Sequence, residues 1–216
     1  MTARRPRPRS RSSAADLEIR ELTPELWPEF EKLFGQNGAC AGCWCMWWRI
    51  PDGERFVDVR GPEAKRRQKA LVLSGKSRGL LAFAAGEPVG WCAYGRRSEF
   101  VALARSRTLA SGGAGFAGDG GRPPAAPPVD VDAVWSLPCF FIKRGWRGRG
   151  VARALLRAAL ATLARQGARI AEAYPVRPPA SNASAFTGTV PWLESEGFRV
   201  VTDRPRGRQR ARRSLD

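Results

Sequence analysis

The stretch from residue 133 to residue 176 constrains the fold more than any other, because its pattern places one helix between two strands. The apolar run AVWSLPCFFI (133–142) predicts a buried strand, and apolar residues at helical spacing over 151–163 predict an amphipathic helix that ends before Gly167. The run RIAEAYPV (169–176) predicts a second strand. A helix between two strands normally crosses over to join parallel strands of one sheet. The chain therefore predicts an α/β fold.

The rest of the sequence predicts further elements of both kinds around this unit. Alternating or apolar runs bounded by turn residues predict strands at 17–22, at 79–95 as a pair around the turn GEP, and at 198–201. Capping residues, early prolines and terminal glycines predict helices from Pro24 or Pro28 to Gly35, over 62–74, within 98–109 and within 188–198.

The composition predicts one domain between two basic ends. Residues 1–15 are rich in Arg, Pro and Ser without an apolar period, which predicts a disordered tail. The domain is expected over 16–204, and 205–216 is expected to form a basic C-terminal edge strand or a tail. Gly, Pro or Ala occupy 15 of the 19 positions of 110–128, which predicts a flexible insertion.

The formal net charge of +17 leaves two interpretations open. A basic protein attracts polyanions, including nucleic acid and phosphate-rich ligands. Arginine-rich ends can equally be solvated charge that reflects a GC-rich genome. A non-catalytic nucleic-acid-binding protein is therefore one hypothesis, although the sequence contains no recognised reader motif. Weak nucleic-acid contact through the arginine-rich tails is a milder form of it.

The sequence predicts neither a membrane protein nor a secreted one. The longest apolar runs are too short to span a bilayer, and no apolar segment follows the basic N-terminus, so we expect no signal peptide and a cytoplasmic location. The five cysteines are then expected to stay reduced. The chain has no histidine, which excludes Ser-His and Cys-His catalytic pairs and imidazole metal ligands.

The segment WRGRGVARALL (146–156) places two glycines and three arginines where the predicted helix begins. Free N–H groups at a helix N-terminus, with glycines that permit close approach, form an anion site suited to a pyrophosphate. The segment lacks both the Gly-Lys-Ser/Thr ending of a P-loop and the Gly-x-Gly-x-x-Gly dinucleotide fingerprint. Instead, Arg147, Gly150 and Ala152 form Arg-x-x-Gly-x-Ala, which resembles the pyrophosphate-binding motif of the GNAT superfamily of acyl-CoA-dependent N-acyltransferases.

The order of elements around this motif is similar to the GNAT core over residues 17–202. The resemblance implies a central mixed, mostly antiparallel sheet with a parallel, splayed strand pair, flanked by helices. It also implies an N-acetyltransferase that moves an acetyl group from acetyl-CoA to a primary amine by direct attack. A small-molecule or a peptide acceptor, a homodimer, and a GNAT fold that binds CoA without turnover all stay open.

The resemblance further implies where acetyl-CoA binds as cosubstrate. Its pyrophosphate would contact the turn before the helix, formed by Arg147, Gly148, Arg149, Gly150, Val151 and Ala152. Its pantetheine arm and acyl group would lie along the end of the preceding strand, at Cys139, Phe140, Phe141 and Ile142. Pro138 independently predicts a break in that strand, because proline removes a ladder donor.

The catalytic residues are harder to assign from the sequence. Many GNAT members place a tyrosine four residues before the glycine of the terminal GF motif, where this chain has Leu193. Tyr174 is the candidate acid, and Glu172, two residues earlier on the same strand face, is the candidate base. The alternatives are a packed tyrosine, a solvated glutamate, and a base supplied by water or by Asp130, Asp132 or Glu99. An acyl-cysteine at Cys139 is conceivable, but a small buried hydrophobe is the expected role of this residue.

The loop GACAGCWCMWWRIP (38–51) carries three cysteines and three tryptophans. Its Cys-Trp-Cys-Met-Trp-Trp run is similar to a bacterial GNAT subgroup. Cys40, Cys43 and Cys45 could suggest zinc, but a closed site needs four ligands and the chain has no histidine, so we expect no metal. In the GNAT architecture this segment walls the acceptor site, so the candidate substrate-binding residues are Trp44, Trp47 and Trp48. Packing in the core is the alternative for these rings.

Overall fold

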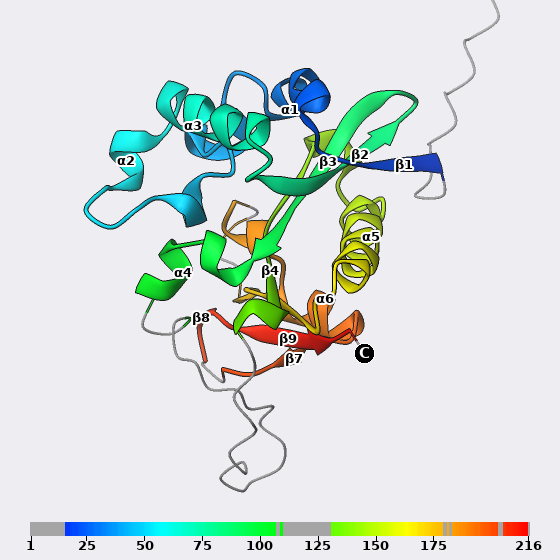
Figure 1. Ribbon diagram of the computed structural model, residues 1–216. Coiled ribbons are helices and arrows are strands. Elements are labelled where there is room, and N and C mark those ends of the chain that lie inside the picture. The colour runs from blue at the N-terminus through cyan, green and yellow to red at the C-terminus, as the bar shows by residue number, and fades with distance from the viewer. Residues whose placement is uncertain are drawn as a thin grey trace, which may run out of the picture.

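A seven-stranded sheet with helices on both faces organises the chain, as Figure 1 shows for the computed structural model. The structure describes residues 16–106, 109, 131–178, 181, 183–202 and 205–215. The predicted disordered tail at 1–15 and flexible insertion at 110–128 lie outside the described residues.

The strands are β1 (Leu17–Glu21), β2 (Arg78–Ala84), β3 (Glu87–Arg96), β4 (Val134–Ile142), β5 (Ile170–Ala173), β6 (Val176–Arg177), β7 (Arg199–Val200), β8 (Gly207–Arg208) and β9 (Ala211–Ser214). The α-helices are α1 (Trp27–Phe34), α2 (Phe56–Val59), α3 (Pro62–Leu73), α4 (Ala102–Arg105), α5 (Val151–Arg165) and α6 (Val190–Ser195). Shorter helical turns are η2 (Pro24–Leu26), η3 (Gly38–Gly42), η4 (Trp47–Arg49), η5 (Arg97–Glu99), η6 (Val131–Ala133), η7 (Arg144–Trp146) and η8 (Ser184–Thr187).

The strand order in the main sheet is β1-β2-β3-β4-β5-β9-β7, and β6 pairs with β8 in a separate two-stranded sheet. Neighbours in the main sheet are antiparallel except β4 and β5, which are parallel. Helix α5 makes the crossover between these two strands, as the sequence pattern predicts. The mixed, mostly antiparallel α/β sheet with one parallel pair is therefore confirmed.

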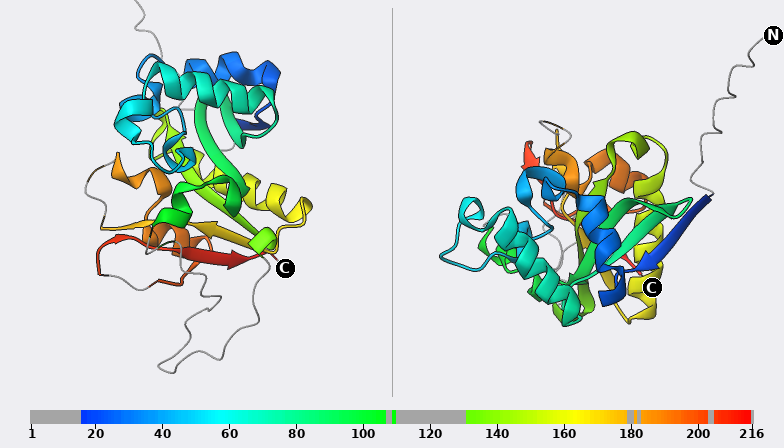
Figure 2. Two further views of the ribbon diagram at one scale, coloured as in Figure 1. Left: turned by 60° about the vertical axis from the view of Figure 1, so that its left-hand side comes forward. Right: turned by 90° about the horizontal axis from the view of Figure 1, so that it is seen from above.

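Both faces of the sheet are buried, which explains why β2 is apolar along nearly its whole length. Leu80 and Ala82 belong to the core beneath α5, whereas Leu81 and Phe83 belong to the core beneath α1 and α3. Successive side chains of a strand point to opposite faces, so a strand covered on both sides must be apolar at every position. Figure 2 shows α5 on one side of the sheet and the N-terminal helices on the other.

The parallel pair separates at Pro138. Strand β4 pairs with β5 from Val134 to Leu137. Beyond this point β4 continues to Ile142, whereas β5 ends at Ala173. Proline has no N–H for the ladder. The carbonyl of Pro138 accepts a hydrogen bond from a side chain, the indole Nε1 of Trp48, at 2.9 Å. The predicted splay is thus present, and the predicted single strand over 169–176 is in fact two short strands.

The C-terminal segment differs from the expected edge strand or tail. Strand β9 lies inside the sheet, between β5 and β7. Arg210 and Arg212 are only 3% and 7% exposed, so these basic residues are internal and not a solvated end. The physical reason is an acidic partner on β5, Glu172, whose position in space the local sequence does not show.

Candidate active site

A turn with two left-handed glycines joins η7 to α5. Gly148 has φ +73° and Gly150 has φ +80°, a region that side-chain-bearing residues rarely adopt. The chain that leads into η7 and this turn is anchored to the sheet, because the Lys143 N–H donates to the Val89 carbonyl at 2.9 Å. The residues of this turn are exposed, and the first N–H groups of α5 have no partner within the helix. The arrangement is an open cradle of backbone donors at the N-terminus of a fifteen-residue helix.

Exposed arginines surround this cradle. The Arg147 side chain donates from Nε to the Ile142 carbonyl at 3.1 Å, and the Arg149 guanidinium lies 5.2 Å from the ring centre of Trp146. Arg153, one turn into α5, pairs instead with the buried carboxylate of Glu196. The cradle therefore has two nearby cations that are not neutralised by a carboxylate in the part of the chain that is described.

The end of β4 runs directly into this cradle. Cys139 and Phe140 are 7% exposed, and Phe141 and Ile142 are partly buried. One edge of this segment pairs with β3, through Cys139 opposite Ala93 and Ile142 opposite Gly90. Among the described residues no strand pairs with its other edge beyond Leu137, so that edge is where an extended ligand can lie.

The structure brings Tyr174 and Glu172 together but encloses both. The Tyr174 hydroxyl donates to Glu172 Oε1 at 2.8 Å and lies 2.6 Å from Ser136 Oγ. Both residues are 0% exposed, and burial, followed by the charge of Glu172, raises the pKa of Tyr174 well above its usual value. Neither residue lines a cavity beside β4.

Arginines from two distant segments hold the Glu172 carboxylate. Arg97 donates to Oε1 at 2.8 Å and Arg212 donates to Oε2 at 2.7 Å. These partners come from η5 and β9, far from Glu172 in the sequence, so sequence reasoning missed them. Two guanidinium groups and a phenol therefore donate to this one carboxylate.

The three predicted tryptophans have different surroundings. Trp44 is buried and stacks on Phe34 with ring centres 5.7 Å apart, inside the core beneath α1. Trp48 is buried between β4 and Tyr174, whose ring centre lies 5.9 Å away. Trp47 is 41% exposed. Of the three tryptophans, Trp47 and Trp48 line a cavity and Trp44 does not.

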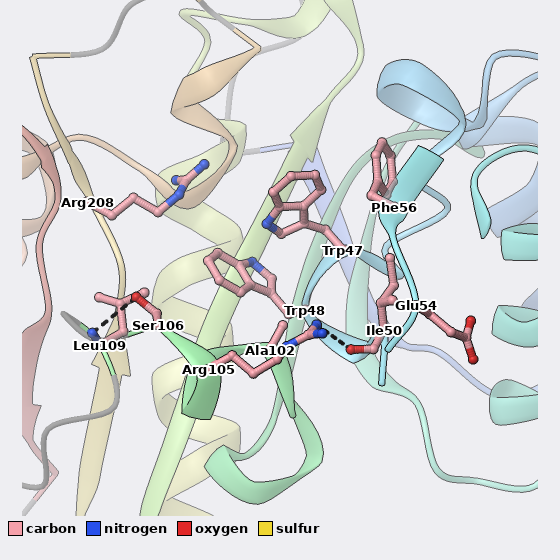
Figure 3. A pocket seen from close by; sticks show the side chains of 10 residues that line it. All are labelled: Trp47, Trp48, Ile50, Glu54, Phe56, Ala102, Arg105, Ser106, Leu109 and Arg208. Carbon is pink, nitrogen blue, oxygen red and sulfur yellow. Dashed lines mark hydrogen bonds between the residues drawn. The ribbon is translucent and has the colours of Figure 1, made fainter. Parts of the chain in front are cut away.

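Two cavities share part of their walls, and the smaller one reaches the end of β4. The larger, of about 480 Å³, is shown in Figure 3 and is lined by Trp47, Trp48, Ile50, Glu54, Phe56, Ala102, Arg105, Ser106, Leu109 and Arg208. The smaller, of about 210 Å³, is bounded by the end of β4 through Cys139, Phe140 and Phe141 and by the cysteine-containing loop. Trp47, Phe56 and Arg208 border both cavities. Sequence reasoning missed Arg208, because it lay in a segment interpreted as a basic end.

The cysteines of this region differ, because a hydrogen bond from Cys139, followed by one from Trp91, lowers the pKa of the buried Cys45. Hydrogen bonding to Cys45, together with burial, raises the pKa of Cys139 well above its usual value, and burial raises the pKa of Cys43 to about 11. A raised pKa leaves a thiol protonated and weakly nucleophilic. Within the described residues, no group of three or more His, Cys, Asp or Glu side chains is arranged to hold a metal ion.

The chain shares its fold with solved structures that are described as acetyltransferases. The chain is similar to a ribosomal-protein-alanine N-acetyltransferase from Brucella melitensis (15% identity, TM-score 0.52, covering 91% of this chain and 99% of that one). It is also similar to an acetyltransferase from Thermus thermophilus (18%, 0.50, 94% and 99%) and to a protein from Salmonella typhimurium solved with its cofactor acetyl-CoA (15%, 0.50, 93% and 95%). At these identities the likeness shows the fold.

The family itself is shown by a sequence model. The model of the acetyltransferase (GNAT) family matches residues 20–186, and this chain belongs to that family. The search of curated proteins finds no significant match to the sequence. No helix in the described part of the chain is long and apolar enough to cross a membrane.

Proposed function

We propose that this protein is an N-acetyltransferase that moves an acetyl group from acetyl-CoA to a primary amine by direct attack. One observation carries the proposal: the segment 139–152 joins the cavity-lining end of β4 to the glycine cradle of α5. An acyl donor with a phosphorylated arm needs both parts, and the family supplies the reaction type.

The residues of the cradle fit the phosphates of acetyl-CoA. Backbone N–H groups of Gly148 to Ala152 point from a helix N-terminus, two glycines hold the turn, and Arg147 and Arg149 add positive charge. The segment 139–152 contains no acidic residue that would oppose a phosphate. Acetyl-CoA supplies an acyl group that is activated as a thioester.

The free edge of β4 is proposed to hold the acyl group. Backbone N–H groups near Cys139 and Phe140 would stabilise the negative charge that develops on the acyl oxygen. In the transfer a nitrogen–carbon bond forms and the carbon–sulfur bond breaks. The amine loses a proton and the departing sulfur gains one, so the transfer is balanced. Cys139 serves as an apolar wall in this proposal, because its raised pKa disfavours an acyl-cysteine.

We assign Tyr174 as the proton donor and Glu172 as the residue that positions it. A raised pKa keeps the Tyr174 phenol protonated, so it does not take the proton of the amine. Because the hydroxyl is enclosed, donation to the departing thiolate requires the wall at Trp48 to move. Glu172 accepts from that phenol and is fixed by Arg97 and Arg212. Water in the cavities is proposed to take up the proton of the amine.

The acceptor is proposed to enter through the larger cavity, past Trp47 and Trp48. Its walls admit a small-molecule amine or the end of a peptide. A cytoplasmic location belongs to the same proposal. The structure supports it with five free cysteines, which are typical of a reducing compartment.

The test is the melting temperature of the full chain with and without acetyl-CoA, at low and at moderate salt. Ligand at a hundred times its dissociation constant stabilises by about 2.7 kcal/mol. For a domain of this size the expected increase is on the order of 5–10 °C, and it should persist at moderate salt. Release of the CoA thiol in a screen of primary amines would then test transfer.

A basic patch without a cofactor site predicts the opposite result. Acetyl-CoA would then give no stabilisation, or one that disappears with salt and that any polyanion reproduces. That outcome would reject the cofactor site and favour nucleic-acid binding. Stabilisation without thiol release in any amine reaction would identify a CoA-binding GNAT fold without turnover.

A further inference from the structure

Arg208 occupies the boundary between the two cavities. It lies on β8, and its side chain borders both the acceptor cavity and the smaller cavity that reaches Cys139. Figure 3 shows its guanidinium group directed from one wall toward the rings of Trp47 and Trp48 on the other. The group lies 5.6 Å from the ring centre of Trp48 and 4.5 Å from that of Phe186.

Among the residues that the structure describes, the guanidinium of Arg208 has no counter-charge and has unused donors. Its hydrogen bonds within the described residues all come from Nη1, which donates to the Thr187 hydroxyl and, at 3.5 Å, to the Ser184 carbonyl. No carboxylate of the described chain lies within ion-pair distance of it. Burial lowers the pKa of Arg208, the direction expected for a cation whose solvation is not replaced. A partly buried cation that no described carboxylate compensates is costly to keep, which makes Arg208 a candidate for binding an anionic ligand.

The other charged groups of the acceptor cavity already have partners. Arg105 donates to the carbonyls of Ile50 and Pro51 at 2.5 and 2.8 Å. Glu54 accepts from Arg67 at 2.6 Å. In Figure 3 the Arg105 side chain turns toward Ile50, and the carboxylate of Glu54 turns away from the space between the walls.

Most of the remaining wall is apolar. It consists of Trp47, Trp48, Ile50, Phe56, Ala102 and Leu109. A cavity of this kind takes a ligand with an apolar body and one anionic end. Arginine binds a carboxylate through two parallel N–H donors, the strongest such pairing in proteins.

We propose that Arg208 binds a carboxylate of the acceptor, and that the acceptor is a free amino acid with an apolar side chain. Because Arg208 also borders the cavity of Cys139, a carboxylate held there keeps an α-amine near the end of β4 while the apolar side chain lies among the tryptophans. A peptide N-terminus has an amide at this place and lacks the charge. This inference rests on the proposed acetyl transfer for its reaction, but the binding site can be tested without it.

The first experiment measures binding without acetyl-CoA. Isothermal titration of the full-length protein would compare N-acetyl-L-phenylalanine with its neutral amide, in the wild type, Arg208→Gln and Arg206→Gln. Arg206 is exposed in the same segment and serves as the control. We expect the wild type and Arg206→Gln to prefer the acid by about tenfold or more, the range of a hydrogen-bonded charge. Arg208→Gln should bind both compounds equally.

The Arg208→Lys variant tests whether a loss of binding in Arg208→Gln comes from misfolding. It keeps the charge but loses the two-donor geometry, so it should retain a reduced preference for the acid. Equal binding of acid and amide by the wild type, or an unchanged preference in Arg208→Gln, would overturn the carboxylate site.

Transfer rates give a second, separate readout. L-Phenylalanine, L-phenylalaninamide and 2-phenylethylamine share an apolar body and an amine, but only the first has a carboxylate. We expect kcat/KM to be highest for the acid in the wild type and to become similar for all three in Arg208→Gln. An equal loss for all three amines in Arg208→Gln would overturn the proposal, because Arg208 would then act on the acyl group. If no amine is acetylated but titration still shows an acid preference that depends on Arg208, the transferase proposal fails and the carboxylate site stands.

Discussion

At the scale of single residues, the assignment that most needs measurement is the role of Tyr174 as proton donor. Its hydroxyl lies between Ser136 and Glu172, and its ring contacts Trp48 at the wall of the larger cavity. Such a phenol can be a proton donor or a buried link in the core. The two roles have different kinetic signatures, because a donor acts only in the transition state.

Tyr174→Phe should lower kcat while leaving the affinity for acetyl-CoA unchanged. A positioned acid typically contributes about 10²–10⁴-fold to the rate. The matched control is Tyr94→Phe, which removes a hydroxyl from the only other tyrosine, on the opposite side of the sheet beneath α5. Steady-state rates of both variants with the preferred amine would show whether the Tyr174 hydroxyl contributes to kcat. Wild-type turnover in Tyr174→Phe would remove this residue from the mechanism and leave it a role in packing.

At the scale of elements, the α5 N-terminus and the free end of β4 define the candidate cofactor site together. Neither is a site alone: the helix offers donors and β4 an unpaired edge. Their junction depends on Gly150, the N-cap residue of α5, whose backbone is left-handed. The prediction for this junction separates a charge effect from a backbone effect.

Gly150→Glu should abolish acetyl-CoA binding and leave the fold intact, because a carboxylate would occupy the cradle for the phosphates. Gly167→Glu is the control, since Gly167 has φ +79° beyond the other end of α5. Both variants should lose stability by about 1–2 kcal/mol from the left-handed backbone. Titration calorimetry and melting curves would test this. Unchanged affinity in Gly150→Glu would reject the cradle as the cofactor site.

At the scale of the whole molecule, Glu172 connects the C-terminal segment to the centre of the sheet. Its carboxylate accepts hydrogen bonds from Arg97 of η5, from Arg212 of β9 and from Tyr174, two residues further along the chain. This network inserts a basic C-terminal strand into the sheet interior. Removing one partner of a buried ion pair leaves the others without compensation.

Glu172→Gln should therefore destabilise the protein by about 3–5 kcal/mol. Glu194→Gln, an exposed glutamate on α6, should change the free energy of unfolding by less than about 0.5 kcal/mol. Urea unfolding followed by fluorescence would measure both. Wild-type stability in Glu172→Gln would contradict the role of Glu172 in holding the C-terminal strand.

The local pattern of the sequence determined most of the fold. Apolar periodicity and glycine punctuation predicted the β4–α5–β5 crossover, and Pro138 predicted the break in its parallel pair, because these features depend on backbone geometry close in the chain. The cradle at 147–152 was visible for the same reason. Family membership, reached first through a resemblance at this motif, is confirmed.

Only the tertiary structure decided which side chains meet. Glu172 lies 40 residues from Arg212 and 75 from Arg97 in the chain, so no local pattern could show that the predicted base is locked in a buried network. The same limit applies to the tryptophans: Trp44 packs in the core while Trp47 and Trp48 line the larger cavity. The sequence around Arg208 predicts solvated charge, whereas the structure places Arg208 on β8, at the wall of the larger cavity. Contacts between distant segments depend on packing of the whole chain, and sequence spacing does not encode them locally.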